Sequence, residues 1–257
     1  VLAGDFITFV DDKPMLGLSL SEAVEIMRGP VGSTIKLTIV REGLEDPIEV
    51  QVIRDVIKLT AARVRIENNV VIMRVTTFNE QTMPNLEDGI KAVMEQIGEK
   101  EPKGFVLDLR NNPGGLLSEA ISVTDLFLDQ GEIVSTRDRE GKGERYKAFK
   151  GDIAEGKPLV ILINAGSASA SEIVAGALQD HRRAIVLGTK SFGKGSVQSV
   201  LPMGQSGGIR LTTARYYTPS GRSIQALGVT PDIFLKFKRV EESEEDKRKT
   251  FSEADLE

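Results

Sequence analysis

The 257-residue sequence has no cysteine and no tryptophan, and its one histidine is His181. Without cysteine, thiol catalysis, cysteine-based zinc sites and disulfide bonds are all excluded. A conventional Ser–His–acid triad would have to use His181. This residue stands among charged neighbours at the end of a helical segment. We therefore predict that it is a helix-end surface residue and not a catalytic base.

Long apolar runs and an excess of positive charge are also missing. No run approaches the roughly 18 apolar residues of a membrane-spanning helix. The net charge of −5 argues against a general nucleic-acid binder. The first residues carry no basic start, so we expect any targeting segment to lie outside this sequence. The hydrophobic content of 40% is enough to form a substantial core.

The first part of the chain has the pattern of a small β-rich unit. Ser19 and Glu22 have the spacing of a capping box, and the helix that they begin should end at Gly29-Pro30. Residues 34–41 and 48–53 alternate between apolar and polar side chains, which predicts two half-buried strands.

Strands and helices alternate through the main body, which predicts a layered α/β core. The expected elements are a hairpin at 60–66 and 70–76 around Asn68-Asn69, helices at 84–98 and 116–128, buried strands at 104–109 and 158–164, and strands over 207–218. The charged segment 137–151 is expected to be an exposed hairpin or loop.

The stretch from Asn164 to Gln198 has the strongest chemical signal. It combines small residues, a helical segment and a second apolar run that leads to Lys194. Ser169 stands where a buried strand passes into a helix. At such a junction, free backbone N–H groups and the helix dipole stabilise an oxyanion. We therefore interpret Ser169 as a nucleophile.

Lys194 is the candidate base for this serine. A lysine with an ordinary pKa of about 10.4 is a poor base at neutral pH, and burial lowers the pKa towards the working range of about 7–8. Glycines flank Lys194 and give it a setting of little bulk. Gln198 lies four residues further on and could orient the amine. By position alone, however, Ser169 is more often a helix cap, and a lysine between glycines is more often a surface or phosphate-binding residue.

Three charged residues near these motifs have alternative roles. Glu172 either stabilises the helix start, which we favour, or orients the surroundings of Ser169. Asp108 and Arg110 flank the end of a buried strand, where we favour a structural ion pair over direct support of the site.

Five motifs give the chain a resemblance to the carboxy-terminal processing peptidases, a serine protease family with a Ser–Lys pair. The motifs are S-A-S-A-S-E-I-V-A-G-A-L-Q-D, G-T-K-S-F-G-K-G-S-V-Q, L-D-L-R-N-N-P-G-G, Y-Y-T-P-S-G-R-S-I-Q and G-V-T-P-D-I. With the N-terminal segments, the resemblance extends over nearly all of residues 3–235. It implies an α/β core of the crotonase and Clp-protease type with a PDZ domain.

The resemblance also implies roles for individual residues. Ser169 would be the nucleophile, Lys194 the general base and Gln198 its positioning partner. The backbone N–H groups of Gly115 and Ala170 would form the oxyanion hole. Glycine at position 115 fits a close approach of backbone to substrate.

The expected domains are a partial PDZ-like domain at 1–57, a catalytic core at 58–238 and a charged, mobile tail at 239–257. The N-terminal resemblance is to the later part of a PDZ domain, a fold that binds an extended peptide as an added strand. The first strand and the carboxylate-binding loop of such a domain are expected before Val1.

The resulting prediction is a serine endopeptidase that cleaves proteins or peptides near their carboxy termini. It implies no metal and no organic cofactor. The expected partners are protein or peptide substrates bound through their carboxy termini, and not nucleic acid. Peripheral membrane association and oligomer formation stay open. The family resemblance implies an extracytoplasmic location.

Three alternatives come from other functional classes. Residues 188–195 nearly match the phosphate-binding pattern G-x-x-x-x-G-K-[ST], which would make the protein a nucleotide binder, although Gly195 replaces the hydroxyl residue. A second alternative is a non-catalytic PDZ-type peptide-binding module. A third is an acyl-CoA enzyme of the crotonase type.

Overall fold

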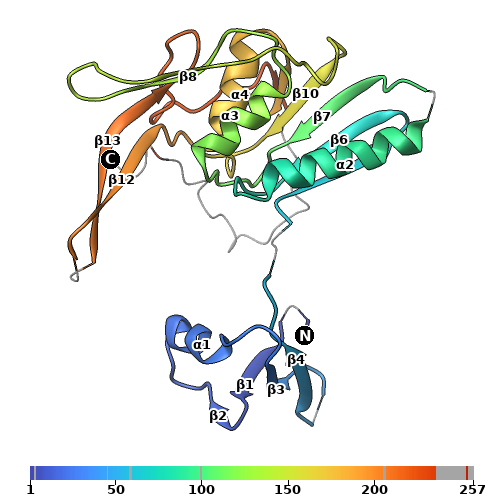
Figure 1. Ribbon diagram of the computed structural model, residues 1–257, viewed down its shortest axis with the longest axis vertical. Helices are drawn as coiled ribbons and strands as arrows, with labels where there is room; N and C mark the ends of the chain where they lie inside the picture. Colours follow the sequence, from blue (N-terminus) through green and yellow to red (C-terminus); the bar gives the residue numbers. More distant parts are fainter. Residues whose placement is uncertain are drawn as a thin grey trace, which may run out of the picture. The chain divides into compact units, whose positions relative to one another are not determined.

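The computed structural model describes residues 1–257 except 3, 45, 58, 59, 99, 205, 206, 236–252 and 254–257. The chain divides into two compact units, Val1–Lys58 and Leu59–Glu257 (Figure 1). The PDZ-like and catalytic assignments of these units remain predictions from the sequence. The predicted tail at 239–257 lies outside the described residues, apart from Glu253.

The first unit is a four-stranded sheet with one short helix. The strand order is β2-β1-β3-β4. The elements are β1 (Phe6–Val10), β2 (Lys13–Pro14), α1 (Leu20–Met27), β3 (Thr34–Val40) and β4 (Ile48–Ile53). The predicted capping box is confirmed: the Glu22 N–H donates to Ser19 Oγ at 3.3 Å, and the Ser19 N–H donates to the Glu22 carboxylate at 2.9 Å. Alternate residues of β3 form most of its small core.

The second unit has a six-stranded sheet in the order β14-β11-β10-β7-β6-β5. Its strands are β5 (Ala62–Glu67), β6 (Val70–Val75), β7 (Gly104–Asp108), β10 (Leu159–Ile163), β11 (Ile185–Gly188) and β14 (Ile233–Phe234). All neighbours pair in parallel except β5, which is antiparallel to β6 at one edge. The turn between β5 and β6 has Asn68 and Asn69 at φ +52° and +62°, as the predicted hairpin requires.

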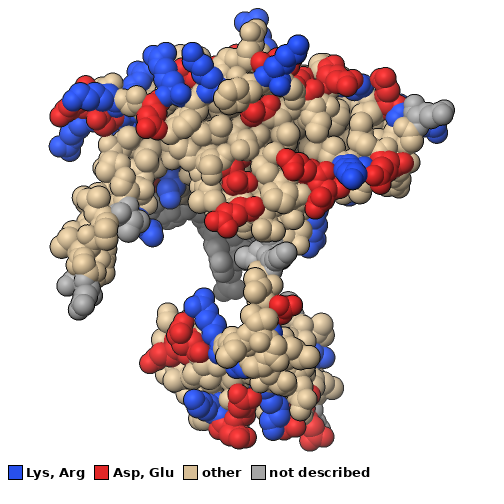
Figure 2. Space-filling view, viewed as in Figure 1, with Lys and Arg blue, Asp and Glu red and all other residues tan. Residues whose placement is uncertain are grey.

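A smaller antiparallel sheet has the order β12-β13-β8-β9. It consists of β8 (Glu132–Arg137), β9 (Arg145–Lys147), β12 (Ser196–Pro202) and β13 (Gly208–Tyr217). β13 confirms the strand predicted over 207–218, whereas β8 and β12 were not predicted. The described residues at the far end of the β12–β13 ribbon are largely uncharged (Figure 2).

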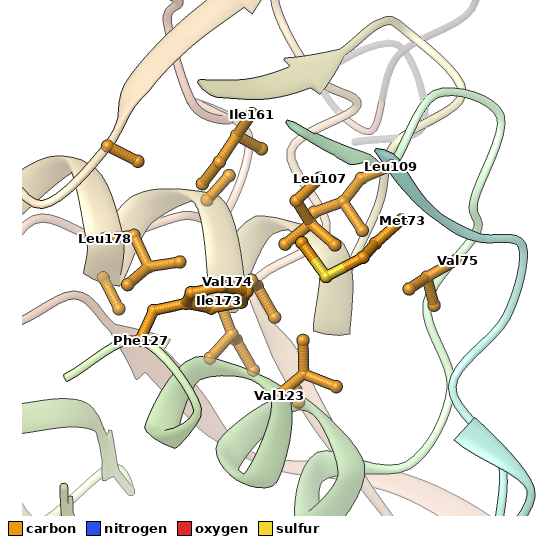
Figure 3. Packing of buried hydrophobic residues seen from close by; sticks show 14 of the residues in the cluster. Met73, Val75, Leu107, Leu109, Val123, Phe127, Ile161, Ile173, Val174 and Leu178 are labelled. Carbon is orange, nitrogen blue, oxygen red and sulfur yellow. The ribbon is translucent and has the colours of Figure 1, made fainter. Parts of the chain in front are cut away.

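Three helices pack on the larger sheet: α2 (Thr82–Ile97), α3 (Leu117–Asp125) and α4 (Ala170–Asp180). The first nine residues of α4 are all buried, as expected of a helix enclosed by the core. Ile173, Val174 and Leu178 of α4 lie among core residues from the central strands and from the α3 segment (Figure 3). The predicted layered α/β core is confirmed. No helix among the described residues combines the length and the apolar character needed to cross a bilayer.

Candidate active site

The candidate site lies where β7 and β10 end. These are adjacent parallel strands, and ligands bind near the carboxyl ends of such strands in open α/β sheets. The loop after β7 carries Asn112 and the two glycines 114 and 115. The loop after β10 carries Ser167 and Ser169 and leads into α4.

Hydrogen bonds join the two loops into one framework. The Asn112 carbonyl accepts from the Ala168 N–H at 3.0 Å and from Ser171 Oγ at 2.9 Å. Ser167 Oγ donates to the Leu109 carbonyl at 2.8 Å. The Asn112 side chain is buried and donates to the Val75 carbonyl at 2.9 Å. The loops are therefore fixed to the sheet and to each other.

Ser169 is the N-cap residue of α4 and has a strained backbone. Its φ of 56° and ψ of −113° lie outside the regions that a serine ordinarily occupies. A non-glycine residue held in this way costs about 1–3 kcal/mol, and such residues cluster at functional sites. The predicted placement of Ser169 at a strand-to-helix junction is confirmed, and its side chain is half-buried.

Gly114 and Gly115 bring their loop into close contact with Ser169. A Cβ atom on Gly114 would lie 2.8 Å from the Ser169 Cβ and 2.9 Å from the Ala170 nitrogen. Gly115 has φ +147°, and a Cβ there would lie 2.0 Å from the Phe78 carbonyl oxygen. No acceptor among the described residues binds the N–H groups of Gly115 and Ala170. Two free backbone donors thus lie beside the serine.

Glu172 connects the serine to the lysine loop. Its fully buried carboxylate accepts four hydrogen bonds, from the N–H groups of Ser169 (2.7 Å), Gly193 (2.7 Å) and Lys194 (2.9 Å) and from Ser191 Oγ (2.5 Å). Burial raises the pKa of Glu172 above its usual value, although these hydrogen bonds oppose the rise. The favoured helix-start role accounts for only one of the four bonds.

Lys194 and Gln198 lie on the loop and strand that follow β11. The Lys194 side chain is half-buried, and within the described chain no hydrogen bond joins its amine to Ser169 Oγ. Gln198 is exposed on β12 opposite Thr212. The structure brings the backbones of Ser169 and Lys194 to the same carboxylate. The base and positioning roles of Lys194 and Gln198 remain predictions.

The fold bears on the nucleotide-binding alternative and on the position of His181. A phosphate-binding loop opens into a helix, but the segment after Gly195 is strand β12, so the nucleotide-binding hypothesis loses its anion site. His181 follows the C-terminus of α4, about 18 Å along the helix from Ser169. Its Nε2 is 2.6 Å from the Glu132 carbonyl oxygen, which agrees with the predicted helix-end position.

Asp108 forms the predicted ion pair with Arg110 at 2.7 Å and a second one with Arg74, also at 2.7 Å. Burial alone would raise the pKa of Asp108, but hydrogen bonds from the two arginines outweigh it and hold the pKa below its usual value.

In the described part of the chain, no group of three or more histidine, cysteine, aspartate or glutamate side chains could hold a metal ion.

Comparison with known proteins gives a consistent result. The family model for peptidase family S41 matches residues 69–235. The carboxy-terminal-processing protease of Bartonella bacilliformis is 55% identical over 237 residues, which are 92% of this chain and 55% of that protein. CtpA of Bacillus subtilis is 35% identical and covers 89% of this chain and 48% of its own length. The chain spans about half the length of the curated relatives that it matches.

A solved structure with the same fold is the photosystem II D1 C-terminal processing protease. It has a TM-score of 0.63 and 30% identity and covers 92% of this chain and 64% of its own. This similarity and the match over residues 69–235 agree on one assignment: the chain belongs to peptidase family S41.

Proposed function

We propose that this chain carries the catalytic part of a serine endopeptidase that cleaves proteins or peptides near their carboxy termini. Ser169 is the nucleophile and Lys194 the general base. The observation that carries the proposal is the strained Ser169 with two free N–H groups beside it. The names of the relatives, which refer to carboxy-terminal processing, support the same substrate class.

The proposed reaction has two stages. Ser169 Oγ attacks the scissile carbonyl carbon while its proton passes to Lys194 Nζ. The oxyanion that forms accepts hydrogen bonds from the Gly115 and Ala170 N–H groups. The C–N bond then breaks, and the leaving amine takes the proton from Lys194. A water molecule attacks the resulting ester, with Lys194 again accepting the proton, and Ser169 is regenerated.

Four further features belong to this proposal. Gln198 orients the Lys194 amine, as the family resemblance implies. The first unit acts as a PDZ-like domain that binds peptide strands. The protein works outside the cytoplasm, which the family resemblance supports. The carboxylate of Glu172 acts as a positioning group, because it fixes the Ser169 and Lys194 backbones together.

The test is cleavage of an unstructured protein by the parent chain beside Ser169→Ala and Lys194→Ala. We expect the parent to cleave and both variants to lose at least about 10³-fold in rate. Equal cleavage by all three proteins would assign the activity to another site and overturn the proposal.

The competing candidate is a non-catalytic peptide-binding module. It predicts no cleavage by any of the three proteins, even when the chain is extended to the full length of its relatives. Cleavage that appears only in the extended chain would support the protease. It would show that the catalytic residues are present here but need the additional segments for activity.

A further inference from the structure

The four-stranded sheet of the second unit bears a surface hollow of about 420 Å³. Its walls come from the end of β8, the turn that follows it, and β13. Arg137, Arg139 and Arg215 line it together with Tyr217 and Asp138. In Figure 2, basic side chains at the upper left are interspersed with acidic ones, over the loop that follows β8 in Figure 1. We call this feature the arginine hollow.

The three arginines of the hollow have no acidic partner in the part of the chain that is described. Neighbouring cations do: Lys142 pairs with Glu140 at 2.7 Å, and Arg145 pairs with Glu132 at 3.5 Å. Asp138 lies in the hollow, but its Oδ1 accepts the N–H groups of Glu140 and Lys142 within its own turn, at 2.9 Å each. The hollow therefore carries a net positive charge.

Strand pairing places two of these arginines directly opposite each other. Arg215 of β13 is the register partner of Arg137 of β8. Like charges in this position destabilise a sheet. The Arg137 guanidinium lies 4.4 Å from the centre of the Tyr217 ring, which orients the group without neutralising it. A bound anion would relieve the repulsion and use the oriented donors.

A carboxylate is the anion whose shape fits this arrangement. The planar guanidinium presents parallel N–H donors that bind both oxygens of one carboxylate. The volume of the hollow lies in the range of pockets that hold small ligands. Thr212 and Thr213 also line it, and the Thr213 hydroxyl is already hydrogen-bonded to the Ser199 hydroxyl at 2.9 Å.

The hollow is close to the candidate base along the sheet. Arg215 is paired with Ser196, two residues after Lys194, and the Tyr216 N–H donates to the Gly195 carbonyl at 2.7 Å. Neighbouring strands are about 4.8 Å apart, and an extended peptide advances about 3.3 Å per residue. An extended peptide of a few residues is therefore long enough to reach from the lysine loop to the hollow.

We propose that the arginine hollow binds the terminal carboxylate of a peptide whose scissile bond lies at Ser169. This inference rests on the proposed function and adds a substrate-recognition site to it. The anchored carboxylate then fixes cleavage a few residues before the end of the chain.

The test uses Ser169→Ala, which binds peptide without cleaving it, and the fluorescence anisotropy of three labelled peptides. One peptide ends in a free carboxylate, the second is the same peptide with an amidated end, and the third is amidated with an aspartate near its end. We expect the free acid to bind at least about tenfold more tightly than either amidated peptide.

Matched variants locate the effect. Adding Arg137→Gln and Arg215→Gln should abolish the preference for the free acid, and the melting temperature should stay level or rise because like charges are removed. Arg210→Gln is the control, since Arg210 is exposed on the same strand but lies outside the hollow. It should keep most of the preference.

Three results would overturn the proposal: equal binding of the free and amidated peptides, equal binding of the aspartate peptide, and a preference that survives the double substitution. A cleavage assay with the parent chain separates this proposal from the proposed function. A preference lost in the double variant would support the hollow even if the parent were inactive, and cleavage by the parent would support the protease even if the hollow failed.

Discussion

Glu172 is a buried carboxylate that binds only donors. Three backbone N–H groups and the Ser191 hydroxyl surround it, and the same hydroxyl accepts from the Val229 N–H. A carboxylate can accept all of these bonds, whereas an amide would present its own N–H₂ to some of the donors. This chemistry explains why an ionisable residue occupies a fully buried position between the two predicted catalytic residues.

Glu172→Gln should therefore reduce both activity and stability. We expect kcat to fall about 10²-fold because Ser169 and Lys194 lose their common anchor. We expect the free energy of unfolding to fall by about 3 kcal/mol because buried N–H groups lose their acceptor. Glu119→Gln is the control, since Glu119 is also a first-turn acid and accepts one bond, from the Met83 N–H at 3.2 Å. Equal effects of the two substitutions would contradict the positioning role.

The ion pairs of Asp108 should make the stability of the folded protein depend on pH in the acid range. Its folded-state pKa lies below the usual 3.8, so the ion pairs with Arg74 and Arg110 stabilise the protein above that pH. Their contribution is lost as the pH falls through the depressed pKa. Asp108→Asn should lower stability at pH 7 by about 3 kcal/mol, because both ion pairs of this largely buried carboxylate are lost, and should flatten the decline below pH 4. Melting temperatures between pH 2 and 7 measure this, with the exposed Asp88→Asn as control. Parallel curves for parent and Asp108→Asn would refute it.

At the scale of elements, the glycine loop after β7 is the feature that sets the backbone beside Ser169. The Phe78 N–H donates to the Gly114 carbonyl at 3.0 Å, and the Leu116 N–H donates to the Phe78 carbonyl at 2.8 Å. These bonds hold Gly115 against Phe78 and leave its own N–H free. A side chain at position 115 would collide with this bridge.

Gly115→Ala should thus lower kcat by at least about 10²-fold, because it displaces the proposed oxyanion donor. The control is Gly141→Ala, where φ is also positive at +81° but no atom lies within 4 Å of the added Cβ. It carries backbone strain without the collision and should leave kcat within about twofold of the parent. An equal loss in both variants would show that strain, and not displacement, causes the effect.

Local chemistry decided which elements could be predicted from the sequence. The capping box of α1 and the Asn68-Asn69 turn lie within a few residues of the structure that they specify. β8 pairs with β13, about eighty residues away in sequence, and β12 joins the same sheet. Neither strand has a local turn signal of that strength. The hydrogen bonds that Glu172 accepts from residues 191, 193 and 194 could not be predicted from the sequence for the same reason. Only the folded sheet brings these segments together.

At the scale of the whole molecule, the chain has two separate cores. The first unit packs around Val10, Ile35, Leu37 and Ile39, and no residue of this cluster belongs to the core of the second unit. The hydrophobic content of 40% predicted a substantial core, and the PDZ resemblance of the N-terminal segments placed the predicted domain boundary after residue 57. The family resemblance, and not periodicity, provided the roles of Ser169 and Lys194.

Because the two units have separate cores, we predict two unfolding transitions in calorimetry. Ile39→Ala and Leu107→Ala each remove a fully buried side chain, one in each unit. Each should cost about 2–5 kcal/mol in its own transition and leave the other unchanged. A single transition that both substitutions shift equally would contradict independent cores.

The most direct test of Ser169 as a nucleophile activated by Lys194 is reaction with a fluorophosphonate, followed by peptide mass mapping. We predict an adduct on Ser169 alone, with Lys194→Ala reacting at least about 10²-fold more slowly. Ser167 and Ser171 are internal controls, because both hydroxyls are buried and donate to backbone carbonyls. An adduct on another residue, or an unchanged rate in Lys194→Ala, would contradict a serine activated by this lysine.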